Sequence, residues 1–437
     1  MYGYGVGQGR TCRIGAIAVA AAATLAFGAA PADAAGFSYR DDAAFMPEHE
    51  KVFSGGGLKL FAECQAAPLS QDLDVFARSE RNNAILHFDS LSDDDGDVTG
   101  YGNVDDFDAG PANEATITTA DDDAVGRIVY RRGKRVVSVD YLAEDGVVPG
   151  ENDCLFAGVT HVAKAGSGGF VFSQLRNSEP RRVFKGGGLT LRADCDNFMT
   201  SPTLVVSAKS LVDGAAIHAS SLANPNDGAT VVDDFGGHDL LNAGDKVTLT
   251  DNPAVSDVQL IEARNASGEF VFAHRGAVVT IHWLAQRFAA TDKCLFAGTV
   301  DVRKRGSSRR IFFRHDVDEE TTAILSLAGF KFFGACDADG PATATRVSST
   351  QGQGASLHIG EQSDQGDDGS DEFFYAEIDD MITGVQYLIG SSLAGGENAL
   401  GQLVYARGSR VVSADYLVDE DGALGSQCAI AGTGASG

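Results

Sequence analysis

The chain contains one cysteine-bounded unit written three times, and this repetition limits the possible folds more than any other feature. Each copy opens with glycine and an alternating segment that ends in cysteine: GGGLKLFAEC (55–64), GGGLTLRADC (186–195) and LAGFKFFGAC (327–336). Each copy closes with an apolar segment and a second cysteine: VVSVDYL before Cys154, VVTIHWL before Cys294, and VVSADYL before Cys428. Internal similarity of this kind predicts three similar structural units.

The local pattern within each copy predicts strands. Leu58, Leu60, Ala62 and Cys64 alternate with polar or aromatic neighbours, which is the period of a half-buried strand. Arg-Gly pairs at 132–133, 275–276 and 407–408 are placed where tight hairpins would turn. Helical periodicity extends over no more than about two turns anywhere. We expect about eight or nine short strands per copy, the texture of a β-sandwich or jelly roll.

The fold prediction is therefore an all-β protein of three tandem β-sandwich or jelly-roll-like domains. Copies of about 130 residues are long enough to bury their own cores, which favours three separate units joined in a row. Small polar linkers between the copies suit this division. The expected boundaries are 1–34 for a signal peptide and 35–165, 166–306 and 307–437 for the three repeats.

The N-terminal segment has the pattern of a secretory signal peptide. Arg10 and Arg13 precede an uncharged, alanine-rich run, and Pro31 and small residues follow it, which predicts cleavage before Ala35. No second long apolar segment is present in the sequence, so we expect a secreted or extracytoplasmic product with no membrane span. An uncleaved membrane anchor remains the alternative.

Six cysteines remain after the signal segment, two in each copy. The repeat makes one pairing the simplest of the 15 that six cysteines allow: Cys64–Cys154, Cys195–Cys294 and Cys336–Cys428. Loops of this length would each stabilise the fold by about 4.5 kcal/mol in the chain-entropy model. A zinc site of the CxxC type is not indicated, because the cysteines are not clustered.

The chain is strongly acidic, with a formal net charge of −27 at pH 7. Removal of the signal segment takes away Arg10, Arg13 and Asp33, a net +1, and changes this to −28. A basic footprint for nucleic acid is therefore not expected. The acidic composition suits ordinary solubility, or alternatively a shell that attracts metal counter-ions.

Acidic loops offer the first candidate metal site. Asp93, Asp95 and Asp97 lie in the densest cluster, and Asp364 and Asp368 lie in the corresponding loop of the third copy. Oxygen-rich loops can bind calcium, although the EF-hand spacing is not met here. A solvated loop between strands is the competing interpretation.

Recurrent histidines and one tryptophan are further candidates. His87, His218 and His358 occupy equivalent positions and alternate with apolar residues, which favours a surface or cross-strand role over catalysis. The motif at Asp140 recurs at Asp415 but has histidine at 282, which argues against a shared catalytic acid. An aromatic residue follows each of these positions, and we expect its side chain to pack in the hydrophobic core or at a sheet edge. Trp283, the only tryptophan, is the candidate for stacking on a sugar ring.

Over residues 36 to 434 the chain resembles secreted bacterial repeat proteins with paired cysteines, through the GG-L-L-C openings and the C-LFAG closings quoted above. The resemblance implies an extracellular β-rich module. It brings no assigned activity, and no functional residue is carried over from it.

These observations predict a secreted, non-enzymatic binding or cell-surface structural protein with no catalytic residues assigned. The sequence does not identify a partner; the candidates are an extracellular glycan and a component of the cell envelope. Two alternatives remain open: a carbohydrate-binding protein, with or without calcium, and an extracytoplasmic hydrolase. No cofactor other than calcium is suggested by the sequence.

Overall fold

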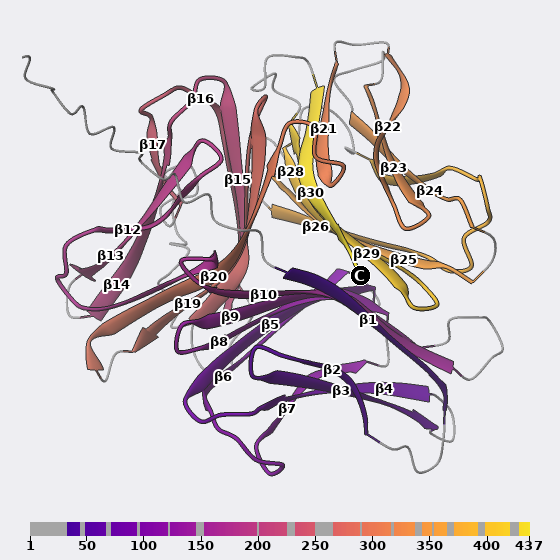
Figure 1. Ribbon diagram of the computed structural model, residues 1–437, viewed down its shortest axis with the longest axis horizontal. Coiled ribbons are helices and arrows are strands. Elements are labelled where there is room, and N and C mark those ends of the chain that lie inside the picture. Colours follow the sequence, from indigo (N-terminus) through magenta and orange to yellow (C-terminus); the bar gives the residue numbers. More distant parts are fainter. Residues whose placement is uncertain are drawn as a thin grey trace, which may run out of the picture.

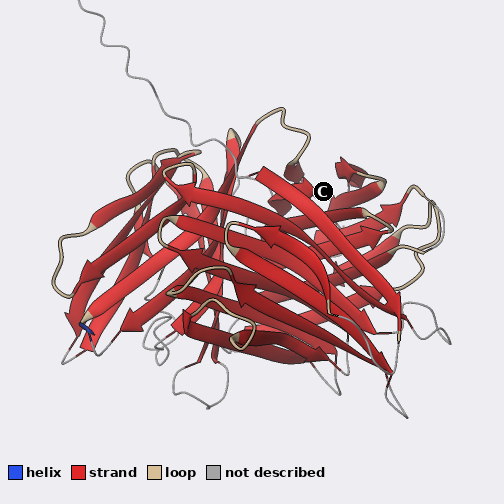
Figure 2. Ribbon diagram, turned by 60° about the horizontal axis from the view of Figure 1, so that its bottom comes forward, coloured by secondary structure: helices blue, strands red, loops and turns tan. Residues whose placement is uncertain are grey.

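The computed structural model describes residues 33–43, 49–66, 71–93, 97–120, 123–145, 153–198, 201–224, 232–249, 265–288, 291–315, 319–336, 343–351, 354–364, 371–391, 398–419 and 428–437. Strands make up most of these ranges, and none of them contains an α-helix, so the all-β prediction is confirmed (Figure 2). No helix long and apolar enough to cross a membrane occurs within the described ranges.

The first repeat contributes ten strands, which form a six-stranded and a four-stranded sheet. The larger sheet has the order β1-β10-β9-β8-β5-β6 and the smaller one β2-β3-β4-β7. The strands are β1 (Asp33–Asp42), β2 (Glu50–Gly55), β3 (Leu58–Ala66), β4 (Gln71–Ser79), β5 (Ala84–Asp93), β6 (Asp97–Phe107), β7 (Glu114–Ala120), β8 (Ala124–Arg132), β9 (Arg135–Asp145) and β10 (Asp153–Ala165).

The second repeat has the same topology, with sheets β11-β20-β19-β18-β15-β16 and β12-β13-β14-β17. A short parallel pairing of β10 with β11 joins its larger sheet to that of the first repeat, so the two six-stranded halves form one continuous 12-stranded sheet. The strands are β11 (Gly168–Leu175), β12 (Arg181–Gly186), β13 (Leu189–Phe198), β14 (Ser201–Ser210), β15 (Ala215–Asn224), β16 (Val232–Leu241), β17 (Lys246–Thr248), β18 (Asn265–His274), β19 (Ala277–Phe288) and β20 (Lys293–Lys304).

The third repeat follows the same order again, with sheets β21-β30-β29-β28-β25-β26 and β22-β23-β24-β27. The strands are β21 (Arg310–His315), β22 (Glu319–Leu327), β23 (Phe330–Cys336), β24 (Thr343–Ser349), β25 (Ser356–Asp364), β26 (Asp371–Ile378), β27 (Tyr387–Ser391), β28 (Ala399–Arg407), β29 (Arg410–Asp419) and β30 (Cys428–Ser436). Each repeat therefore has ten described strands, slightly more than the eight or nine that the sequence suggests.

Local sequence explains the hairpin that opens each repeat. In β3 the alternating residues Leu58, Leu60, Ala62 and Cys64 are buried, as the pattern predicts. The turn before β3 has φ of 62° at Gly56 and 100° at the next glycine, and a two-residue hairpin turn with positive φ at both positions favours glycine.

A hydrophobic core lies between the two sheets of each repeat, and one disulfide crosses it. Cys64 on the four-stranded sheet bonds to Cys154 on the six-stranded sheet, and the same arrangement joins Cys195 to Cys294 and Cys336 to Cys428. All six cysteines of these disulfides lie within the three cores. The three predicted disulfide pairs are confirmed.

The three six-stranded sheets face one another at the centre of the molecule, and the four-stranded sheets lie outside them (Figure 1). The two faces of strand β9 pack against different parts of the molecule. Val137, Val139 and Tyr141 point into the core of their own repeat, whereas Val136 and Leu142 pack against other repeats. The expectation of separate units joined in a row is therefore wrong, because each repeat buries a second apolar face on its neighbours.

The contacts between repeats form a closed ring. Val136 of the first repeat shares a buried apolar cluster with Leu284 of the second, and Val278 of the second shares another with Leu417 of the third. A further cluster contains Val411 of the third repeat and Leu142 of the first. Because these residues occupy equivalent positions in β9, β19 and β29, the repeats are related by a pseudo-threefold axis.

Candidate functional site

Polar side chains from all three repeats meet on the pseudo-threefold axis. In each repeat, backbone pairing places one residue of the cluster opposite another. The three pairs are Arg127 with Asp140, Glu269 with His282, and Gln402 with Asp415. The first member of each pair lies on β8, β18 or β28, and the second on β9, β19 or β29. We call these six residues the axial cluster. Five of them are buried and Gln402 is partly buried, and they combine charges of both signs where polar groups need specific partners.

Arg127 is the only cation of the axial cluster and touches all three repeats. Its Nη2 donates to Glu269 Oε2 at 2.8 Å and to Asp415 Oδ1 at 3.3 Å, and its Nε donates to Asp140 Oδ1 at 3.3 Å. Only 4% of the arginine surface is exposed. A guanidinium group suits this position because its donors diverge in one plane and reach several carboxylates at once.

His282 lies between the two aspartates. Its Nε2 is 3.2 Å from Asp415 Oδ2, and its Nδ1 is 3.7 Å from Asp140 Oδ1 and 3.2 Å from the hydroxyl oxygen of Ser138. Asp140, His282 and Asp415 each offer one ligand atom, and these atoms lie within 4.8 Å of one another. These residue types and distances could hold a metal ion.

Burial controls the protonation of these groups. It raises the pKa of Asp140 and Asp415, against the opposing effect of Arg127. The pKa of Glu269 is also raised by burial and by the charge of Asp415. Burial lowers the pKa of His282 to about 3, so the imidazole is neutral at physiological pH.

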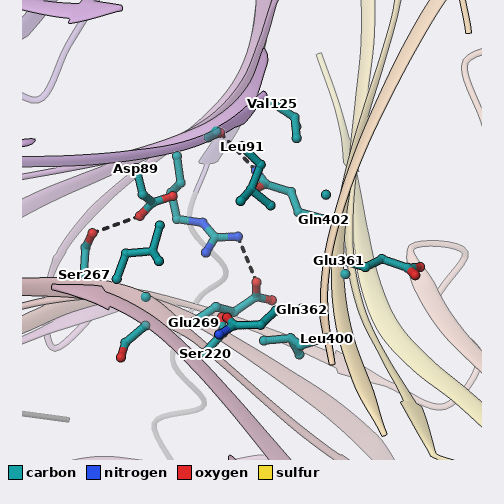
Figure 3. Close-up of a pocket in the computed structure, with 17 residues that line it drawn as sticks. Asp89, Leu91, Val125, Ser220, Ser267, Glu269, Glu361, Gln362, Leu400 and Gln402 are labelled. Atoms are coloured by element: carbon teal, nitrogen blue, oxygen red, sulfur yellow. Dashed lines mark hydrogen bonds and ion pairs between the residues drawn. The ribbon is translucent and has the colours of Figure 1, made fainter. Parts of the chain in front are cut away.

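A small pocket of about 60 Å³ lies on the axis beside the cluster (Figure 3). Arg127 and Glu269 contribute to its wall, together with residues from all three repeats. Asp89 accepts a hydrogen bond of 2.9 Å from Ser267, which links the first repeat to the second in this wall. The polar lining and small volume suit water or a small ion better than an organic ligand.

No protein family matches this chain, and no curated protein is similar to it in sequence.

The predicted calcium loops lie largely outside the residues whose side chains the structure describes. Asp95 and Asp368 lie outside the described residues altogether. Asp93, Asp97 and Asp364 belong to strand ends of β5, β6 and β25, but their side chains are not among those described. Calcium binding by these loops stays a prediction.

Trp283 lies in the core of the second repeat, with 2% of its surface exposed. Its ring stacks on Phe270 at a centroid distance of 5.2 Å and also contacts Phe296. Glycine at 268 faces it on β18, where a Cβ atom would lie 2.8 Å from the indole. The ring serves as a core anchor, and this conformation leaves no face for a sugar.

The three recurrent histidines are fully buried rather than on the surface, because the outer faces of their strands are covered by other repeats. His87 Nδ1 lies 3.0 Å from the carbonyl oxygen of Ala266 in the second repeat. His358 Nε2 lies 3.6 Å from Glu144 Oε2 of the first repeat, and Asp379 completes a second group of potential metal ligands there. The predicted cross-strand contact does occur, since Tyr101 and Tyr375 lie beside His87 and His358.

Sequence reasoning missed the axial cluster, although one signal was available. The segments VVSVDYL, VVTIHWL and VVSADYL have apolar residues at consecutive positions, which is typical of strands buried on both faces. Polar residues on the outer face of such a segment then lie against other repeats and need buried partners there or in their own repeat. Histidine replaces aspartate at 282, the position equivalent to Asp140 and Asp415, and the three repeats contact one another at these positions.

Proposed function

We propose that this protein is an extracytoplasmic binding or surface-structural protein, made of three tandem β-sandwich domains that follow a cleaved signal peptide. Three disulfides within an all-β chain are compatible with an oxidising environment outside the cytoplasm. The buried ring of contacts around Arg127 is the observation that carries the structural part of the proposal, since it joins the three domains into one body.

The hydrolase alternative draws no support from the axial cluster. Asp140, His282 and Asp415 are each at most 4% exposed, so a substrate would have to separate the domains to reach them. A buried network that links three domains supports rigidity instead.

Export and oxidation test the proposal directly. The full chain, expressed with its own N-terminus in a bacterial host, is expected to be recovered outside the cytoplasm with Ala35 as its first residue. Titration of the denatured, unreduced product with a thiol reagent should then find none of the six mature cysteines free. A cytoplasmic product that keeps Met1 and reactive thiols would contradict the proposal.

We propose recognition of an anionic group as the binding activity, because a basic cleft lies between the second and third repeats. Arg275, Arg305, Arg310 and Arg314 line it together with Phe312, and its volume is about 560 Å³. This volume is within the range of ligand sites, and four arginines stand out in a chain with a net charge of −27.

The geometry of Arg310 supports an anion site. Its guanidinium lies over the ring of Phe312 at 4.1 Å and donates to the carbonyl oxygens of His274 and Arg275, which fixes its position. Burial, followed by the nearby charge of Arg305, lowers the pKa of Arg310. Crowded positive charge of this kind would be relieved by a sulfate or carboxylate group, as in an acidic envelope glycan.

Binding of sulfated and carboxylated oligosaccharides, measured by calorimetry at two salt concentrations, tests this activity. Arg275→Ser with Arg305→Ser should weaken binding at least tenfold and reduce its salt dependence. Arg135→Ser, which removes an exposed arginine outside the cleft, is the matched control. Equal affinity of all three proteins would contradict the assignment.

A further inference from the structure

Asp140, His282 and Asp415 each offer one possible donor atom to a metal ion, and these atoms lie within 4.8 Å of one another. His282 Nε2 and Asp415 Oδ2 are 3.2 Å apart, yet the nitrogen has no hydrogen-bond partner among the described residues. Two ligands at about 2.0–2.2 Å from a tetrahedral ion are separated by roughly 3.3–3.6 Å. The measured separation of 3.2 Å is close to this range, so the two atoms could bind one ion after a small adjustment.

A second buried atom points to the same ligand. Asp140 Oδ2 has no hydrogen-bond partner within the described part of the chain, and the residue is fully buried. His161 Nε2 lies 3.9 Å from this oxygen. An unsatisfied carboxylate oxygen in this position is costly unless an ion or another partner binds it.

The balance of charge around the axis favours a cation. Asp140, Glu269 and Asp415 surround Arg127, and Asp89 lies nearby and interacts with it electrostatically. Four carboxyl groups thus face one guanidinium in a region with little access to water. A divalent cation would stabilise the ionised forms of these carboxyl groups.

We propose that Asp140, His282 and Asp415 bind a first-row transition-metal dication of the zinc type on the pseudo-threefold axis. One imidazole nitrogen with two carboxylates suits zinc, whereas calcium takes six to eight oxygen ligands. Each repeat supplies one ligand, so the ion closes the ring of domains. The inference is separate from the acidic-loop calcium prediction and goes beyond the proposed binding or structural role.

Metal content of the exported full chain tests the proposal. Because the site is enclosed, the protein is unfolded in urea with its disulfides intact, freed of metal by a chelator and refolded with Zn²⁺ or Co²⁺. We expect about one equivalent per chain to survive gel filtration, and the Co²⁺ form to show the visible absorption of a low-coordinate site.

Variants separate this site from adventitious binding. His282→Gln and Asp415→Asn should each lose most of the retained metal, whereas Asp153→Asn should keep it. Asp153 is a suitable control because it is also a buried, ion-paired aspartate, but it contacts Arg40 and lies away from the axis.

Two results would overturn the proposal. One is a refolded wild-type chain that retains no metal and whose Co²⁺ form is colourless. The other is equal retention by His282→Gln and the wild type. Because the wild-type measurement needs no substitution, it decides the question even if the variants fail to fold. A negative result would leave the export test and the anion-binding test unaffected.

Discussion

Replacement of Arg127 by methionine tests whether the axial cluster joins the three repeats. The substitution keeps much of the side-chain volume but leaves Glu269, Asp140 and Asp415 without their shared cation. Removal of one partner from a buried ion pair costs about 3–5 kcal/mol. Since Arg127 is 4% exposed and reaches three carboxylates, we expect a decrease in the free energy of unfolding at the upper end of this range.

Urea denaturation measures this decrease, with fluorescence of Trp283 as the probe. Trp283 is the only tryptophan and reports on the second repeat, whereas Arg127 belongs to the first. If the repeats unfold as one body, the fluorescence midpoint will shift with a substitution made in another repeat. The control Arg135→Met removes an exposed arginine and should change stability by less than about 0.5 kcal/mol. An unchanged fluorescence midpoint in Arg127→Met would refute the coupling.

Three further outcomes are expected. Leu417→Ala, at the contact between the second and third repeats, should cost about 2–5 kcal/mol in urea unfolding, whereas a cost near zero would mean that this face is not buried. The double variant Cys195→Ser with Cys294→Ser should lose about 2–5 kcal/mol, seen as an earlier fluorescence transition, and retention of full stability would contradict a structural disulfide. Burial lowers the pKa of His87 to about 4, below the ordinary value of 6.5, so its neutral form is favoured by folding. Wild-type stability should therefore decrease as pH falls from 6.5 towards 4, by up to about 3 kcal/mol from this group, while His87→Gln lacks that part of the decrease; a constant difference between the two proteins over this range would count against it.

Sequence predicted well those parts of the fold that depend on neighbours within one repeat. The alternation at Leu58 to Cys64, the hairpin turns and the cysteine pairing are local or are repeated in each copy, and all three are confirmed. The packing between repeats was not predicted, because the pattern within one repeat does not show which sheet face is covered by another repeat. His87 illustrates the failure: its polarity predicts exposure, but the face that carries it is covered by the second repeat.

The axial cluster also shows why comparison of the copies pointed away from a shared site. A common site was expected to keep the same residue in every copy, so the change from Asp140 and Asp415 to histidine at 282 argued against one. On a closed ring the equivalent positions meet each other, and three aspartates there would repel one another at close range. Three copies within one chain can diverge, so that a neutral imidazole takes one aspartate position and Arg127 meets Glu269 in place of a second arginine. Different residues at equivalent positions are therefore what we expect for a site on the axis of a closed ring. The substitution of histidine at 282 is a difference of this kind.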